Sequence, residues 1–534
     1  MKKLMLALCL VLLLCSCVDG ATKIGLDRIN LSQDKYVTVG PLSSGKVYDY
    51  YTDDVADEIT IMTAAQSLGG RGIVYIDAHN YNFAGTLIVP IGVQLIGMVP
   101  AIYGTGFLGG DNGYIEDATA RFCIINTTHT AVELTTGSGL ENIDFYYPNQ
   151  VTNSSTPISY PFSITLAKSG SHWPAHVTIK NCHTVNAYDF IDARFGHSHF
   201  VVDGLVGTVI HRGILEDNGG HGDIYNNIHF LPHYGGQTLG NLLINYICSN
   251  MIAFEFRECD NGMISQCGVW NAGSGIILSG TNGLFVTQCI FDYVKSPLVL
   301  TNSALNNIIE DNIFVSMQSN YNYAYINTPI YNSLQRAVYI SDTASGGNII
   351  SSNVIRSGGC GIYNNGPRNI ITDNSIQFGF VNSSDGGLSI GINNLAGGSD
   401  SIISGNYVGG GNRIATLGIT TYSSANIFGN AILSVSNGAF YDNAHDVAKK
   451  RITNNIGINP MGALTKPATN PVSGTTYTNY FGCPVLVTIS GGTVTQIAIN
   501  GVNTGLTSGA FVLGPDNSIK VTHSSNPAWT WTGL

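Results

Sequence analysis

The chain has 534 residues, a formal net charge of −11 and only 11% charged residues, while 44% of its residues are hydrophobic. This composition is far from that of a disordered chain, and the length allows a large core. The surplus of acidic residues disfavours nucleic acid and other polyanions as non-specific partners. A neutral partner fits the charge, and so does an acidic partner held by local arginines or by a cation.

The first 17 residues have the pattern of an export signal. Met1-Lys2-Lys3 precedes an apolar run from Leu4 to Leu14, which is too short to remain as a membrane span. The following Leu14-Cys15-Ser16-Cys17 resembles a bacterial lipobox, in which Cys17 would carry a lipid anchor; ordinary cleavage nearby is the alternative. In both cases we expect the mature chain to be secreted or held at the cell surface.

The next segments predict the start of a solenoid. Residues 18–46 are polar and predict an extended lead-in, and the apolar residues between 55 and 68 suit a short amphipathic helix. Strands are expected at 73–77 and within 87–97. A helix that leads into the first strands is a suitable cap, because an open solenoid end would expose a sheet edge and the core. We therefore assign residues 47–97 to the cap and first coils.

A short phrase, Ile-Ile-x-x-Asn-x-Ile, returns between about residue 140 and residue 460. Its clearest copies occupy 308–314, 349–355, 370–376 and 402–408, and looser copies surround Asn142, Asn181, Asn227, Gln266, Gln288, Asn430 and Asn455. Many neighbouring copies are 21 to 25 residues apart, and wider gaps such as 312 to 353 are near doubles or carry insertions. Runs of three to five β-branched residues at this period predict one coil of a parallel β-solenoid. Asn suits the turns because it tolerates left-handed backbone angles, and stacked amides can bond from coil to coil.

We therefore predict that residues 130–458 form a right-handed solenoid of about a dozen coils around an Ile/Val/Leu stack. Cys182, Cys267 and Cys289 directly follow a ladder Asn or Gln, at a position that otherwise holds Ile or Val. This placement predicts buried, unpaired cysteines that act as small hydrophobic residues. No cysteine and histidine spacing typical of a metal site is present in the sequence.

The N-terminal pattern resembles a known superfamily. Asp53-Asp54 precedes the expected helix, Gly69-Gly70-Arg71-Gly72-Ile73-Val74-Tyr75-Ile76 follows it, and then come Tyr81-Asn82-Phe83 and Pro90-Ile91-Gly92-Val93-Gln94-Leu95-Ile96-Gly97. With the repeats, this stretch resembles the pectate-lyase-like superfamily of right-handed parallel β-helices over residues 47–458. The resemblance implies an all-β fold. It does not select an activity, because that superfamily holds lyases, hydrolases, epimerases and phage tailspikes.

The repeat stops near residue 460. A Pro-rich linker at 459–470 is followed by alternating strands over 471–534, which predict a small antiparallel β-sandwich. This segment resembles the C-terminal β-modules often appended to secreted or viral β-helix proteins. Trp529 and Trp531 are predicted either to close the core of this sandwich or to form a platform that stacks on sugars.

The candidate chemistry gathers in the early coils, where nine of the 13 histidines lie between residues 172 and 233. Because strand side chains alternate, Asp192 and Arg194 share one face of their strand, and Glu255 and Arg257 share one face of theirs. The 63 residues from 192 to 255 are read as three coils of 21. Strands stack about 4.8 Å apart, which would bring such residues into one groove. We predict that the catalytic set is Asp192, Arg194, Glu216, Asp217, His221, Glu255 and Arg257.

A second set of polar residues is predicted to bind substrate. Two positions after the ladder Asn or Gln, the early coils place Asp144, His183 and His229, where late coils place residues such as Phe314. The apolar residues of the early coils occupy the adjacent positions, so these three side chains should face outward. The apparent change of phase indicates a binding surface. The alternative is that histidine is simply tolerated on the surface of a charge-poor protein.

Three activities fit such a groove. Hydrolysis of a glycosidic bond needs two carboxylates, for which Asp192, Glu216, Asp217 and Glu255 are candidates. Elimination from a uronic acid needs a base and a cation beside the carboxylate; Arg194 or Arg257 would serve, as Arg does in the lyases this fold resembles, with Ca²⁺ as a cofactor in that case alone. The third is glycan binding without reaction. The order Val202-Asp203-Gly204, Glu216-Asp217 and Gly220-His221-Gly222 is similar to polygalacturonase-type motifs, but its departures, such as Val201-Val202 for Asn-Thr, favour chance.

We therefore expect an exported carbohydrate-active β-helix that acts on a polysaccharide or cell-surface glycan as a lyase or glycoside hydrolase. The alternative is a non-catalytic adhesin or a receptor-binding protein similar to a phage tailspike. The oligomeric state stays open, and a trimer is one option.

Overall fold

The computed structural model describes residues 35–100, 119–168, 173–232, 239–316, 335–378, 389–409, 417–433, 440–442, 451–453, 455, 462–464, 466–479, 484–514 and 517–534. The export signal with Cys17, most of the lead-in and four residues of the linker (459–461 and 465) lie outside the described residues. No helix within the described ranges is long and apolar enough to cross a membrane.

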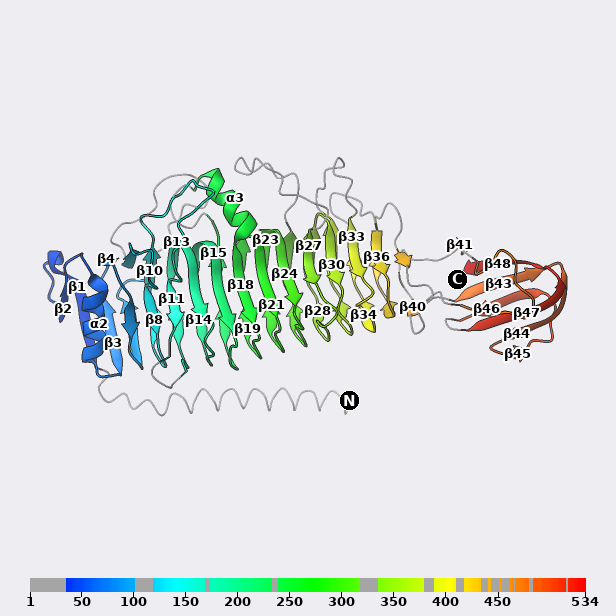
Figure 1. Ribbon diagram of the computed structural model, residues 1–534, viewed down its shortest axis with the longest axis horizontal. Coiled ribbons are helices and arrows are strands. Elements are labelled where there is room, and N and C mark those ends of the chain that lie inside the picture. The colour runs from blue at the N-terminus through cyan, green and yellow to red at the C-terminus, as the bar shows by residue number, and fades with distance from the viewer. Residues whose placement is uncertain are drawn as a thin grey trace, which may run out of the picture.

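The larger part of the chain is a right-handed parallel β-helix, as predicted. Its coils stack along the long axis in Figure 1, and each coil contributes strands to three faces. The first face is a 16-stranded sheet made of β1 (Tyr36–Pro41), β2 (Tyr50–Thr52), β3 (Gly72–Ile76), β6 (Val93–Gly97), β9 (Gly139–Glu141), β12 (Thr178–Lys180), β14 (Val201–Asp203), β16 (Ile224–Asn226), β19 (Met263–Ser265), β22 (Phe285–Thr287), β25 (Ile308–Glu310), β28 (Ile349–Ser351), β31 (Ile370–Thr372), β34 (Ser401–Ser404), β37 (Ala425–Phe428) and β40 (Arg451–Thr453).

A 24-stranded sheet forms the other two faces. The second face holds β4 (His79–Phe83), β7 (Ala120–Ile124), β10 (Ile143–Tyr146), the first halves of β13 (His183–Ala193) and β15 (Val206–Asp217), β17 (His229–Phe230), β20 (Gly268–Trp270), β23 (Ile290–Val294), β26 (Ile313–Ser316), β29 (Val354–Ser357), β32 (Ser375–Phe378), β35 (Tyr407–Val408) and β38 (Ala431–Ile432). The third face holds β5 (Leu87–Val89), β8 (Val132–Leu134), β11 (Ile164–Leu166), the second halves of β13 and β15, β18 (Ile252–Arg257), β21 (Ser274–Ser279), β24 (Ser296–Thr301), β27 (Arg336–Ile340), β30 (Cys360–Asn364), β33 (Ile390–Asn394), β36 (Leu417–Thr421) and β39 (Phe440–Asp442).

Columns of aliphatic side chains fill the solenoid. Ile309, Ile350, Ile371 and Ile403 come from successive coils, stand in register and have 0% exposure. Full burial of one such side chain contributes about 1.5–3 kcal/mol. The repeated aliphatic pair in the sequence therefore supplies the interior column that holds neighbouring coils together.

The asparagine ladder forms as predicted, but its early and late copies are not equivalent. In the late coils Asn312, Asn353 and Asn374 are buried, and each Nδ2 donates to Oδ1 of the next ladder Asn at 2.9–3.1 Å. The left-handed residue in these coils is the one before the Asn, whereas in the early coils the Asn or Gln itself is left-handed. Cys289, and not Gln288, is level with Asn312, because its backbone N–H donates to Asn312 Oδ1 at 2.9 Å. The two halves of the repeat are thus offset by one residue.

This offset explains the cysteines. Cys182, Cys267 and Cys289 are buried and free, as predicted, and they stand at the interior position that the ladder asparagines fill in later coils. Their thiols donate to backbone carbonyl oxygens within their own turns.

Two spacings were read incorrectly from the sequence. The gap from 312 to 353 is a single coil with an insertion, because β25 pairs directly with β28. The 63 residues from Asp192 to Glu255 are two coils and not three, because Asp192 pairs with Leu215 and Leu215 pairs with Glu255. An insertion that includes α3 (Asn241–Asn250) accounts for the extra length.

A helix covers the N-terminal end of the solenoid. Helix α2 (Asp57–Ser67) buries Ile61, Ala64 and Ala65 against the first strands, as the predicted cap requires. The described part of the lead-in contributes β1, which pairs in parallel with β3, and a short 3-10 helix, η1 (Leu42–Ser44).

The C-terminal segment is a β-sandwich of two four-stranded antiparallel sheets, as predicted (Figure 1). One sheet has β41 (Gly462–Ala463), β48 (Ala528–Gly533), β43 (Val485–Ser490) and β46 (Gly509–Leu513), and the other has β42 (Thr476–Thr478), β47 (Ser518–Ser525), β44 (Thr493–Ile499) and β45 (Val502–Asn503). Trp529 and Trp531 are 2% and 1% exposed within its core. They close the sandwich, and the sugar platform is ruled out for these two residues.

Candidate functional site

Three successive strands of the third face bring charged side chains to its outer surface. Asp192 on β13, Leu215 on β15 and Glu255 on β18 stand in one outward column. Ala193 pairs with Glu216, so Arg194 comes level with Asp217, and Asp217 pairs with Arg257. We call the set Asp192, Arg194, Arg212, Asp217, Glu255 and Arg257 the charged face. Five of the seven predicted catalytic residues therefore lie together.

Asp192 and Arg194 form a two-pronged ion pair. Arg194 Nε donates to Asp192 Oδ1 at 2.9 Å, and Nη2 donates to Oδ2 at 2.8 Å. The hydrogen bond to Asp192 raises the pKa of Arg194, and the charge of Asp217 adds to the rise. The Asp192 side chain is 5% exposed and that of Arg194 is 42% exposed. The carboxylate is therefore occupied, while the guanidinium stays accessible to a ligand.

Glu255 repeats this arrangement two coils later with two arginines. Arg257 Nε donates to Glu255 Oε1 at 2.8 Å, and Arg212 Nε lies 2.9 Å from Oε2. The Arg257 side chain is 40% exposed, whereas Glu255 is nearly covered at 8%. Arg212 was not among the residues predicted from the sequence. Its position on β15, the strand next to the one that carries Glu255, is the signal that could have identified it.

Asp217 differs from the other two acids of the charged face. Among the described residues, no hydrogen bond or ion pair engages its carboxylate, and its side chain is partly exposed. It stands between Arg194 and Arg257, about 4.8 Å from each strand. Asp217 is therefore the carboxylate of this face that is free to react.

The prediction that Glu216 lines the groove is wrong. Glu216 stands in register with Ala193 and Phe256, which face the interior, and it is 2% exposed. Strand side chains alternate, so the register that turns Asp217 outward must turn Glu216 inward. His221 lies on the turn after β15, where its Nδ1 is 3.1 Å from Asn261 Nδ2. No ion pair joins His221 to the charged face in the part of the chain that is described.

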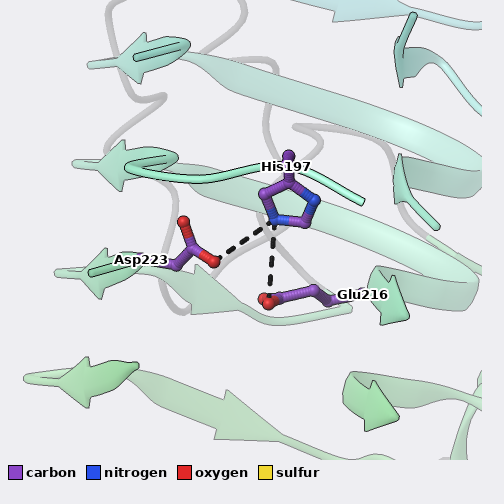
Figure 2. A group of neighbouring side chains, drawn as sticks. All are labelled: His197, Glu216 and Asp223. Carbon is purple, nitrogen blue, oxygen red and sulfur yellow. Dashed lines mark ion pairs between the residues drawn. The ribbon is translucent and has the colours of Figure 1, made fainter. Parts of the chain in front are cut away.

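The inward Glu216 belongs to a buried polar cluster that the sequence did not reveal. Figure 2 shows His197 pointing between Glu216 and Asp223, with Nε2 of His197 3.7 Å from Glu216 Oε1 and 3.4 Å from Asp223 Oδ2. Burial lowers the pKa of His197 to about 4. Burial, and then the charge of Asp223, raises the pKa of Glu216; burial likewise raises the pKa of Asp223.

Two of the predicted substrate-binding residues, Asp144 and His183, join Arg121 in a stack on the second face. Arg121 Nε donates to Asp144 Oδ2 at 2.6 Å, and His183 Nδ1 donates to Asp144 Oδ1 at 2.9 Å. Burial acts to raise the pKa of Asp144, but His183 and then Arg121 outweigh it and hold the pKa below its usual value. Ile143 and Phe145 fill the core, so Asp144 points away from it, as expected.

Access to these residues is limited. Asp144 and His183 are only 2% and 4% exposed. His229 is half-buried two coils beyond His183, and burial lowers its pKa. The sequence pattern that identified these three residues results from the one-residue offset of the ladder, because positions counted from the early and the late ladder residues are not equivalent. Their role in substrate binding stays a prediction.

A groove of about 650 Å³ lies on the outer surface of the first face. Its apolar floor consists of Val201, Ile224, Met263 and Phe285, which stand in one column, and Asp203 and Glu310 are among its polar lining. In the sequence, this surface could have been found from the first Ile of each Ile-Ile pair, which continues the same outward column in the late coils. This groove is a second extended surface.

Comparison with known proteins identifies no family for this chain. No family model matches it, and no curated protein matches its sequence. Among solved structures, the A-module of mannuronan C-5 epimerase AlgE6 from Azotobacter vinelandii is similar with a TM-score of 0.39 and 10% identity, covering 76% of this chain and 97% of the module.

Two further solved structures are of other kinds. Tailspike protein 3 of bacteriophage CBA120 has a TM-score of 0.45 and 12% identity, covering 82% of this chain and 66% of the tailspike chain. The DFA-IIIase of Arthrobacter chlorophenolicus A6 without its lid has a TM-score of 0.43 and 11% identity, covering 79% of this chain and 98% of that enzyme. At these identities and TM-scores, no neighbour assigns a function to this chain.

Proposed function

We propose that this chain is an exported protein that binds an acidic polysaccharide across its charged face and cleaves it by β-elimination. The observation that carries the proposal is the outward column Arg194–Asp217–Arg257, in which a carboxylate free of ion pairs stands between two accessible guanidiniums.

The arginines supply the binding. A guanidinium recognises a carboxylate through two parallel hydrogen bonds, which suits the carboxylate of a uronic acid. Arg194 and Arg257 stand two coils apart, roughly 10 Å at about 4.8 Å per strand. A glycan that runs along the solenoid axis would meet both arginines. Local arginines thus allow an acidic ligand to bind a protein whose net charge is −11.

Asp217 supplies the base. A guanidinium beside the uronate carboxylate stabilises the negative charge that develops when the C5 proton leaves. Asp217 accepts that proton, the C4–C5 double bond forms, and the bond from C4 to the glycosidic oxygen breaks; the leaving oxygen takes a proton from solvent.

Hydrolysis fits this surface less well. It requires two available carboxylates, one protonated and one ionised. Asp192 and Glu255 are already hydrogen-bonded to arginines, and Glu216 faces the interior. Ca²⁺ would require several oxygen ligands, and Asp217 is the one uncommitted carboxylate among the described residues of the charged face. These residues do not fit a calcium site, so no step is assigned to Ca²⁺.

Binding without reaction is the second candidate. Its support is that both exposed arginines already have carboxylate partners, as in a recognition surface. The deciding experiment exposes the purified mature chain to polygalacturonate, alginate and a neutral glucan. Unsaturated ends detected by ultraviolet absorbance mean elimination, and new reducing ends without them mean hydrolysis. Binding of the acidic polymers without either product supports an adhesin. Mass spectrometry of the mature N-terminus tests export and a lipid on Cys17.

A further inference from the structure

The interior of the solenoid holds a second candidate site, separate from the charged face. His197 comes from the turn between β13 and β14, Glu216 from the end of β15, and Asp223 from the turn that leads into β16. Their side chains are 1%, 2% and 1% exposed and converge on one point (Figure 2). One potential ligand atom from each residue lies within 4.8 Å of the other two. No polysaccharide reaches this position.

Polar atoms in this cluster lack well-formed hydrogen bonds. No hydrogen bond of good geometry among the described residues reaches either ring nitrogen of His197 or Asp223 Oδ2. The backbone of Ala193 and the carboxyl group of Glu216 act on these side chains from nearby. Buried polar atoms are almost always hydrogen-bonded, and an exception requires an explanation such as an ion. Nε2 and Oδ2 point at each other across 3.4 Å.

The remaining oxygens are already fixed. Tyr225 Oη donates to Glu216 Oε2, and the backbone N–H of Phe200 donates to Asp223 Oδ1 at 2.7 Å. These bonds leave Glu216 Oε1 and Asp223 Oδ2 turned toward His197. Such support of the ligand side chains from outside is typical of metal centres.

We propose that His197, Glu216 and Asp223 bind a divalent first-row transition metal ion, with Zn²⁺ as the best fit. Two ligands at about 2.0–2.1 Å from a tetrahedral zinc ion stand roughly 3.3 Å apart, close to the 3.4 Å and 3.7 Å seen here. Imidazole selects such metals over Ca²⁺ and Mg²⁺, which prefer oxygen alone. The ion also balances two buried carboxylates that have no arginine or lysine partner among the described residues.

The site ties successive coils together. His197 belongs to the turn after β13, and the other two ligands belong to the following coil, so the ion acts as a cross-link inside the solenoid. It also fixes the end of β15, where Asp217 follows Glu216. Metal loading is therefore expected to stabilise the fold and to hold the charged face in position.

Metal content and thermal stability test the proposal. The full mature chain is produced in metal-depleted medium and titrated with Zn²⁺, Mn²⁺ or Ca²⁺. We expect about one Zn²⁺ per chain by elemental analysis and a rise in Tm on the order of 5 °C or more, because a ligand that binds only the folded state stabilises it. Co²⁺ should give the visible absorption of a site with a nitrogen ligand.

Glu216→Gln separates a metal site from a plain polar cluster, and Asp373→Asn in a late coil is the control. If a metal binds, Glu216→Gln loses it and melts lower than the loaded wild type. If no metal binds, the same change removes repulsion between two buried acids, and its Tm equals or exceeds that of the wild type. Absence of bound Zn²⁺ and of any Zn²⁺-dependent Tm shift in the wild type overturns the proposal, as does unchanged Zn²⁺ binding by Glu216→Gln. Should Glu216→Gln fail to fold, the wild-type titration alone decides.

Discussion

Glu216 and Asp217 are neighbours in the chain and point to opposite sides of the same strand. Glu216 accepts a hydrogen bond from Tyr225 inside the solenoid, whereas Asp217 stands level with Arg257 on the outer surface. The alternation of strand side chains thus gives one carboxylate a structural environment and the other a solvent-facing one.

Replacing Asp217 tests the proposed base. Asp217→Asn keeps the shape and removes the proton acceptor, so turnover of an acidic polysaccharide should fall by roughly a hundredfold or more while binding is retained. Elimination rates and binding isotherms measure the two effects. Asp373→Asn, at an exposed turn position that Asn also accepts, should behave as the wild type. Full activity in Asp217→Asn would remove this residue from the mechanism.

The arginines should control affinity. Arg257→Gln removes one accessible guanidinium, and because hydrogen bonds to charged groups contribute about 1.5–3 kcal/mol, affinity for an acidic glycan should fall roughly tenfold to a hundredfold. Stability should change little, since Glu255 keeps Arg212 as a partner. Isothermal titration at low and high salt measures the effect. Arg368→Gln, exposed in a late coil, is the matched control. Equal weakening by both changes would indicate a general charge effect.

Sequence reasoning could establish the fold because the same local rule repeats in every coil. Each outward residue alternates with a buried Ile or Val. A few clear copies of the repeat, such as 349–355, therefore indicate which residues are buried in the less regular copies. The register between coils is harder to predict, because an insertion adds residues between two paired strands without adding a coil. Asp192 and Glu255 were placed three coils apart for that reason.

The site was only partly predictable for a related reason. Asp192, Arg194, Asp217, Glu255 and Arg257 follow from alternation within single strands, and the structure brings them together. Alternation applied to Glu216-Asp217 as a pair would also have turned Glu216 inward. His197 and Asp223 come from turns, where no periodic rule fixes the direction of a side chain.

The asparagine ladder should contribute strongly to stability. Asn374 Nδ2 donates to Asn406 Oδ1, and Asn374 Oδ1 accepts from Asn353, all at buried positions. Asn374→Ala leaves these partners unsatisfied and should lower the free energy of unfolding by about 3 kcal/mol. Denaturant unfolding measures the loss, with Ser375→Ala, on the outer surface, as the control. If the two changes lower the free energy of unfolding equally, the ladder contributes no more to stability than a surface side chain does.

Asp144 should make stability depend on pH. His183 and Arg121 hold its folded-state pKa below the unfolded value, so the unfolded chain binds the proton more tightly. The stabilisation is therefore fully present above the ordinary pKa of aspartate, about 4, and is lost as pH falls through the folded-state pKa. Asp144→Asn should be less stable at neutral pH and should show a flatter loss of Tm on acidification. If Tm falls with pH as steeply in Asp144→Asn as in the wild type, groups other than Asp144 cause the pH dependence.

The turn after β15 offers a test of how the interior supports the outer surface. A Cβ atom on Gly219 would lie 1.7 Å from Glu216 Oε1, so Gly219→Ala must displace the carboxylate or the turn. We expect a loss of about 1–3 kcal/mol in stability, as for overpacking in a core, together with lower turnover because Asp217 moves with Glu216. Gly474→Ala is the control. A Cβ atom on Gly474 would meet open space, so the only cost of this change is the backbone strain of an alanine at a φ of +77°. Thermal melts and elimination rates measure both effects, and a loss at Gly219 no larger than that at Gly474 would show that the turn tolerates the displacement.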